Sequence, residues 1–164
     1  MDNFINAVYD NNLSSIKKNK NKELLNIIPK GRKYPIIFFT TKHKDCKVLK
    51  YFLKQGINPN SKGKKAFSLL MYASQLGYLN AVKILLKQKK INVNHIGNSG
   101  KTALMEAAQK GHLEIVDLLL KNGANPKIKE KFRNKKSCRT RTASNMALAC
   151  GHKKISKKLK KNKK

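Results

Sequence analysis

Residues 102–125 read TALMEAAQKGHLEIVDLLLKNGAN, and this stretch decides how the chain is organised. Its apolar side chains recur at helical spacing on both sides of Gly111, which predicts two short helices joined by a tight turn. Thr102 is placed to cap the first helix, while Gly111 and Gly123 are placed to end the two helices in the left-handed conformation. One such pair cannot bury its apolar face alone, so neighbouring pairs must stack against it.

The same pattern occurs earlier in the chain at a fixed offset. Residues 68–77 read SLLMYASQLG and match residues 102–111, which read TALMEAAQKG, with an offset of 34 residues. Asn92 falls opposite Asn125 after one extra loop residue, so the underlying period is about 33 residues. Weaker copies lie at 34–60 and 142–152. This periodicity predicts a repeat protein made of stacked helix pairs.

The period and the residue pattern of 102–125 resemble the ankyrin repeat. The resemblance implies an all-α solenoid of about five helix–turn–helix units with degenerate N- and C-terminal caps. It also implies a non-enzymatic binding module. The single domain 1–164 then divides into an N-terminal cap, three repeats, and a C-terminal part that holds a basic loop, a cap repeat and a lysine tail. Those segments are 1–33, 34–61, 62–97, 98–126 and 127–164.

The first repeat and the last helix depart from this family pattern. Lys44 stands in the place of the mid-repeat glycine, and Thr40 stands in the place of a helix alanine. We therefore expect the first repeat to be less regular. The last helix keeps only Ile155 and Leu159 as apolar contacts, which is typical of a terminal cap with a polar outer face.

Charge is the most unusual feature of the composition. The chain has 38 basic and 8 acidic side chains, a net charge of +30. Residues 98–126 are neutral, residues 62–97 contain no acid, and residues 127–164 carry 16 basic side chains and one acidic side chain. This distribution favours a polyanionic partner. The alternative is a solvated surface without a dedicated anion site.

The resemblance implies that loops between repeats project as fingers along one edge. Lys62, Lys64 and Lys65 form one basic finger, and residues 127–141 form a longer one with three of the four arginines. Arginine suits bidentate phosphate contact, and Phe132 is placed to stack on an unpaired base. The remaining candidate nucleic-acid-binding residues are Lys127, Lys129, Lys131, Arg133, Lys135, Lys136, Arg139, Arg141, Lys153, Lys154, Lys157 and Lys158.

Two classes of partner follow from these residues. In the first, the fingers and the lysine tail contact the phosphates of RNA or of a ribonucleoprotein such as the ribosome. In the second, an acidic protein binds the concave face of the solenoid, where Tyr72, Gln75, Glu106 and Gln109 on the first helices supply orientation. An anionic membrane surface is disfavoured, because the tail is poor in bulky apolar residues. We expect a monomer until the partner binds.

Residues that carry enzyme chemistry do not form a recognisable constellation in this sequence. His43 and Cys46 provide two of the ligands that zinc would need, which is too few. His112 and His152 follow the mid-repeat glycine, where the resemblance implies a structural role at the helix start. The sequence has no phosphate-binding glycine loop. We therefore expect no catalysis, cofactor, metal or small-molecule substrate.

The cysteines and the N-terminus bear on the compartment. The three cysteines, Cys46, Cys138 and Cys150, are an odd number without metal-like spacing, which favours a reducing compartment. The sequence shows neither an apolar signal core nor an apolar stretch long enough for a membrane span, so we expect a cytoplasmic protein. Cys138 lies in the basic loop, where nearby cations would lower its pKa and make it reactive.

Overall fold

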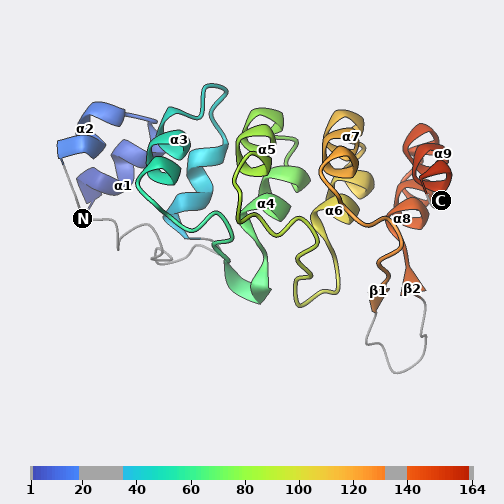
Figure 1. The fold of residues 1–164 in the computed structure, drawn as a ribbon. Coiled ribbons are helices and arrows are strands. Elements are labelled where there is room, and N and C mark those ends of the chain that lie inside the picture. Colours follow the sequence, from blue (N-terminus) through green and yellow to red (C-terminus); the bar gives the residue numbers. More distant parts are fainter. Residues whose placement is uncertain (1, 19–34, 132–139, 163–164) are drawn as a thin grey trace.

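The computed structural model describes residues 2–18, 35–131 and 140–162, and their helices stack as five consecutive pairs (Figure 1). In chain order the pairs are α1 (Asp2–Tyr9) with α2 (Leu13–Lys18), the 3-10 helix η2 (Ile36–Thr41) with α3 (Lys47–Lys54), α4 (Leu69–Gln75) with α5 (Leu79–Leu86), α6 (Ala103–Lys110) with α7 (Leu113–Lys121), and α8 (Ala143–Ala149) with α9 (Lys153–Lys161). This arrangement confirms the predicted all-α solenoid of about five units.

The elements of the solenoid lie in three levels (Figure 1). The first helices α4, α6 and α8 pack side by side in one row, and the second helices α5, α7 and α9 form another row beside it. The loops that lead into the first helices project from the edge away from the second helices. We call these loops finger A (residues 61–68), finger B (residues 95–101) and finger C (residues 128–141). Finger A contains the 3-10 helix η3 (Lys64–Ala66), and finger C contains the strands β1 (Glu130–Lys131) and β2 (Thr140–Arg141).

Helix α6 begins and ends where the sequence predicts, and α4 begins at an equivalent cap. The Ser68 side chain accepts a hydrogen bond from the Met71 backbone N–H at 3.2 Å, and Thr102 accepts one from Met105 at 3.3 Å. Gly111 ends α6 with a φ of 82°, a left-handed conformation in which glycine carries no Cβ penalty. The local signals and the tertiary fold therefore agree in the central repeats.

Two histidines at helix starts connect neighbouring units. The His112 Nε2 atom lies 3.2 Å from the Gln75 carbonyl oxygen of the preceding unit. The His112 ring also covers Gly77, and the His152 ring covers Gly111 in the same way. Both histidines precede a second helix, at the N-cap positions of α7 and α9. Their role is structural packing between repeats, as the sequence indicated.

The first repeat is less regular, which confirms the expectation from its sequence. Its first helix is a 3-10 helix, in which the Thr40 hydroxyl donates to the Ile37 carbonyl oxygen at 2.6 Å. The turn into α3 uses Cys46 at a φ of 49° instead of a glycine. A non-glycine residue in this region pays a steric cost, because its Cβ approaches the backbone. The departure from the repeat pattern is therefore visible as local irregularity.

The two ends of the stack are closed by short helices. At the C-terminal end, Ile155 and Leu159 of α9 are buried, as expected for the last apolar contacts. At the N-terminal end, Phe4, Val8 and Ile16 are buried against the next unit. Among the helices that the structure describes, none has the length and apolarity that crossing a bilayer requires.

Candidate binding surface

The three fingers present equivalent residues along one edge of the solenoid (Figure 1). Asn60 and Asn94 hold equivalent places at the base of fingers A and B, because each accepts a hydrogen bond at 2.8 Å from a backbone N–H of the next unit. Lys127 holds the same place in the last repeat, 33 residues after Asn94. The residues two positions after Asn60, Asn94 and Lys127 are Lys62, Ile96 and Lys129. All three of these side chains are exposed.

Finger A places three exposed lysines close together in sequence and in space. Lys62, Lys64 and Lys65 are all exposed, and the Gly63 backbone N–H closes the finger by donating to the Phe67 carbonyl oxygen at 2.8 Å. The segment 62–97 contains no acidic residue that could neutralise them locally. The structure therefore brings together the whole basic cluster that the sequence predicts in this finger.

Finger C is a short antiparallel hairpin at its base. Glu130 pairs with Arg141 and Lys131 pairs with Thr140 in the two-residue ladder. Lys127, Lys129 and Arg141 are exposed. The described part of the structure excludes the side chain of Lys131 and the following predicted site residues: Phe132, Arg133, Lys135, Lys136, Cys138 and Arg139.

Glu130 is a buried acid that the sequence analysis did not single out. It comes directly after Lys129, at the place that Gly63 and Gly97 occupy in the other two fingers. Its side chain is 1% exposed, and its Oε2 atom has no hydrogen-bond partner among the described residues. Its position in the sequence could have identified it, because it is the single acid of residues 127–164 and stands where the other two fingers have a glycine.

The surroundings of Glu130 perturb its titration. Burial raises the pKa of its carboxyl group above the ordinary value, and the nearby charge of Glu106 raises this pKa further. The positive charges of Lys101 and Arg141 act in the opposite direction and lower it. Charges of the preceding repeat therefore act on the carboxyl group at the base of finger C.

The four residues predicted for a concave protein-binding site make internal contacts. The Gln75 Nε2 atom donates to Glu106 Oε2 at 3.0 Å, and the Lys101 Nζ atom donates to Gln109 Oε1 at 2.7 Å. Lys101 also lies 4.0 Å from a carboxylate oxygen of Glu106. Glu106 is 3% exposed, so it is not the solvent-facing helix residue that its sequence suggests. The Gln75–Glu106 bond links consecutive units, and the contacts of Lys101 lie within one unit.

Tyr72, the proposed aromatic anchor of that concave site, is half-buried. Its ring packs against Phe38 with the centroids 5.3 Å apart, and against Tyr78 at 6.3 Å. The edge-to-face contact with Phe38 stabilises the interface with the preceding unit, while the contact with Tyr78 lies within one unit. The structure therefore gives Tyr72 a role inside the stack.

The predicted lysines of α9 lie apart from the fingers. Lys153, Lys154 and Lys157 are exposed, while Lys158 forms an ion pair with Asp117 at 2.5 Å. In Figure 1, α9 belongs to the row of second helices, across the solenoid from the finger edge. The structure therefore does not bring these lysines together with Lys62, and the predicted basic residues divide between two surfaces.

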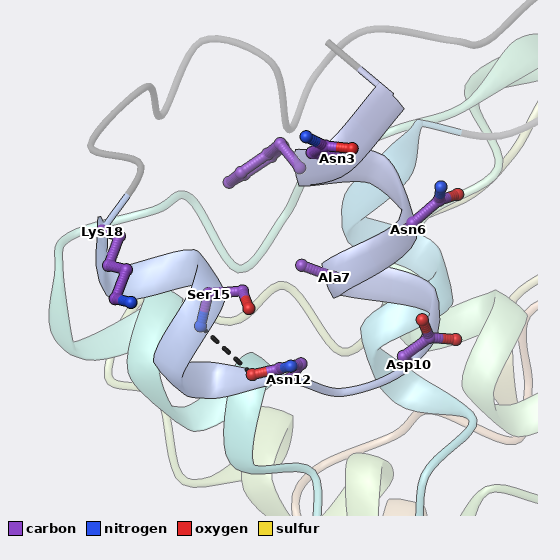
Figure 2. A pocket seen from close by; sticks show the side chains of 8 residues that line it. Asn3, Asn6, Ala7, Asp10, Asn12, Ser15 and Lys18 are labelled. Atoms are coloured by element: carbon purple, nitrogen blue, oxygen red, sulfur yellow. Dashed lines mark hydrogen bonds between the residues drawn. The ribbon is translucent and has the colours of Figure 1, made fainter.

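A shallow hollow lies at the N-terminal end, between α1 and α2 (Figure 2). Its volume is about 420 Å³, and four of its eight lining residues carry amide or hydroxyl side chains, with the Asn12 side chain accepting from the Ser15 backbone N–H at 3.1 Å. Asp10 and Lys18 contribute opposite charges to it. The hollow therefore lacks the excess of cations that the finger edge has.

Comparison with known families agrees with the architecture. A family model described as "Ankyrin repeats (3 copies)" matches residues 4–95, 37–130 and 93–164, which together span almost the entire chain. A search of curated proteins finds no match.

Proposed function

We propose, on the premise that the chain belongs to the ankyrin-repeat family, that its basic fingers dock on RNA or on a ribonucleoprotein such as the ribosome. Ankyrin repeats are protein-interaction modules, so the general function of the chain is binding to a partner. The stacked helices form a scaffold, and the projecting fingers offer the contacts. The proposal specifies the chemistry of that partner.

The observation that carries the proposal is the excess of exposed, unneutralised cations along the finger edge. Lys62, Lys64, Lys65, Lys127 and Lys129 are exposed. Among the described residues, the lysines that form ion pairs are others, namely Lys47, Lys101 and Lys158. Free cations at this density repel one another unless a polyanion joins them, and a phosphate backbone supplies regularly spaced negative charge.

An acidic protein is the second candidate partner, because protein binding is the family's general role. The first-helix residues Gln75, Glu106 and Gln109 support this candidate less well, since their polar groups already pair with each other and with Lys101. Tyr72 likewise packs within the stack. The finger edge therefore carries the proposal better than the concave face.

The main test is RNA binding as a function of salt. A variant with Lys62, Lys64 and Lys65 all changed to Gln is compared with a matched control, in which Lys83, Lys87 and Lys89 on and after α5 are changed to Gln. Both variants lose three exposed positive charges. We expect the slope of log K against log salt to fall by about 2 in the finger variant, at about 0.7 for each phosphate contact with a single strand. Equal effects in the two variants would contradict a site at the fingers.

A second experiment separates the two classes of partner. The tagged chain is used to capture partners from lysate of the source cells, with and without nuclease treatment. Recovery of ribonucleoprotein components only without nuclease supports the RNA proposal. Recovery of one acidic protein in both halves supports the second candidate. A triple change of Arg133, Arg139 and Arg141 to Gln tests finger C in the same assays.

A further inference from the structure

Fingers A and B are joined directly to each other. The Asn98 backbone N–H of finger B donates to the Lys65 carbonyl oxygen of finger A at 2.9 Å. The His95 Nε2 atom lies 2.7 Å from the carbonyl oxygen of the next residue, Ala66. Gly97 is buried beside these bonds, and a Cβ built on it would lie 3.5 Å from the Ala66 carbonyl oxygen. The two fingers therefore form one connected unit.

The connection holds the tip of finger A in an unusual backbone conformation. Lys65 and Ala66 have φ values of 59° and 53°, in the left-handed region that non-glycine residues avoid. Their carbonyl groups are the two that finger B binds. Strained residues persist only where the surroundings determine them, and such residues concentrate at functional loops. Finger B is the surrounding element that determines this tip and, with it, the backbone position of Lys64 and Lys65.

The same unit also presents an apolar side chain to solvent. Ile96 in finger B is 51% exposed, above Leu76, Leu113 and Leu148 among the exposed large apolar residues of the described chain. The equivalent places in fingers A and C hold Lys62 and Lys129. A partner that covers this edge must therefore offer negative charge at its flanks and an apolar face between them.

Unpaired RNA has this combination of properties. Its phosphates supply the negative charge, and its unstacked bases expose flat apolar faces that protein side chains cover. In duplex RNA the bases are stacked on one another, so Ile96 would gain little there. A polyanion without bases satisfies the lysines alone.

We propose that fingers A and B together form a preorganised platform for unpaired RNA. Lys62, Lys64 and Lys65 contact phosphates, Ile96 covers a base, and His95 is a positioning residue that holds the tip of finger A. A platform set before binding loses less conformational entropy when the partner arrives, which strengthens binding. This inference rests on the proposed function and deepens it, because it specifies which form of RNA is bound and where.

The test compares three probes: an unpaired RNA, a duplex RNA of the same length, and inorganic polyphosphate. Ile96→Ser is compared with Leu148→Ser, which changes a side chain of similar exposure, 49%, in α8. We expect Ile96→Ser to bind unpaired RNA about fivefold more weakly, with duplex and polyphosphate unchanged. Leu148→Ser is expected to bind all three probes like the unchanged chain.

The positioning role of His95 has its own matched control. His43, between η2 and α3, makes the same kind of bond to the preceding helix pair, because its Nε2 atom lies 2.8 Å from the Tyr9 carbonyl oxygen of α1. We expect His95→Ala to weaken binding of unpaired RNA about tenfold, while His43→Ala leaves it unchanged. His95→Gln keeps a donor that can reach the Ala66 carbonyl, and it is expected to restore most of the affinity. Circular dichroism confirms that each variant folds.

Each outcome decides the inference. If the unchanged chain binds unpaired and duplex RNA equally and Ile96→Ser has no effect, the platform is wrong while RNA binding stands. If His95→Ala binds like His43→Ala, the positioning role is wrong. If the unchanged chain binds polyphosphate but neither RNA, or none of the three probes, the proposed function and this inference both fail. Selective loss of unpaired-RNA binding in Ile96→Ser and His95→Ala supports both.

Discussion

The helix pairs α6–α7 and η2–α3 hold equivalent places in the stack but are built in different ways. Helix α6 starts at a capping Thr102 and ends at Gly111 in the left-handed conformation. Helix η2 follows Pro35, which makes no side-chain cap, and the turn after it relies on Cys46 at a positive φ. Both units still bury their apolar faces in one continuous core. Stacking therefore sets the architecture, while local signals decide how stable each unit is.

Removing a buried side chain from each unit gives the largest expected effect. Leu104 in α6 and Ile37 in η2 are 1% and 0% exposed. We expect Leu104→Ala to lower the free energy of unfolding of the whole stack by about 3 kcal/mol, because α6 packs against both α4 and α8. Ile37→Ala is expected to act mainly within the first two units. Denaturant unfolding and amide hydrogen exchange measure the two effects.

The same experiment can show that the two helix pairs do not differ in their coupling to the stack. If Ile37→Ala lowers protection throughout α6 and α8 as strongly as Leu104→Ala does, the pair η2–α3 is coupled to the rest of the stack as tightly as the pair α6–α7 is. The irregular η2 would then have no consequence for stability.

The glycine turns give the next largest effect. A Cβ at Gly111 would lie 2.5 Å from the His152 Cε1 atom, whereas a Cβ at Gly123 meets nothing within 4 Å. Both glycines have a positive φ, so alanine is strained at either place. We expect Gly111→Ala to cost about 2–3 kcal/mol and Gly123→Ala about 1 kcal/mol in thermal unfolding. Equal costs would mean that His152 moves aside freely.

The fingers that follow the two helix pairs differ at one equivalent position. Finger C, after α6–α7, has Glu130, and finger A, after η2–α3, has Gly63. Replacing Glu130 with Gln tests the effect of the acid in finger C. The pKa of Glu130 is raised in the folded state above its ordinary value of 4.5, mainly by burial. A raised carboxyl pKa means that the folded state binds the proton more tightly than the unfolded state does. The destabilising effect of the carboxylate is therefore full above the raised pKa and disappears as the pH falls through it towards 4.5.

We accordingly expect Glu130→Gln to stabilise the chain by about 1 kcal/mol at neutral pH, and by progressively less as the pH falls below the raised pKa. Thermal unfolding across that pH range measures the difference. Glu114→Gln, at an exposed glutamate of α7, is the matched control. Destabilisation by Glu130→Gln at neutral pH would show that the attraction of Lys101 and Arg141 exceeds the cost of burial.

Thiol labelling gives the smallest effect and the most local one. Cys46 is buried, and burial raises the pKa of its thiol, with a further increase from the charge of Asp45 and a decrease from Lys50. Cys150 is exposed. We expect a thiol reagent to label Cys150 rapidly and Cys46 only when the pair η2–α3 opens. In a chain that also carries Cys138→Ser and Cys150→Ser, the labelling rate of Cys46 reports that opening. A rate as fast as that of Cys150 would contradict the burial of Cys46.

Much of the fold follows from particular residues of the sequence. Thr102 and Ser68 cap their helices, and Gly111 ends α6, because caps and left-handed glycines depend on only a few neighbouring residues. The irregular first repeat also follows from its sequence, since Lys44 lacks the freedom of a glycine. Local chemistry of this kind can be interpreted without knowing the tertiary contacts.

The surfaces depend on contacts between distant residues. The sequence indicated Glu106 as a polar residue on the concave face, yet its partner Gln75 comes from the preceding repeat and leaves it buried. The lysines of α9 and those of finger A look alike in sequence, but they lie on different sides of the stack (Figure 1). The pKa of Glu130 likewise depends on charges of the preceding repeat, those of Lys101 and Glu106.

The sequence by itself determined the repeat, the two helices of each unit and the excess of positive charge, because periodicity, caps and composition are properties of the chain. Only the tertiary structure decided which charges remain exposed and which side chains meet. Stacking brings residues about one repeat apart into contact, so the His95 bond to finger A and the burial of Glu130 appear only when the units lie side by side.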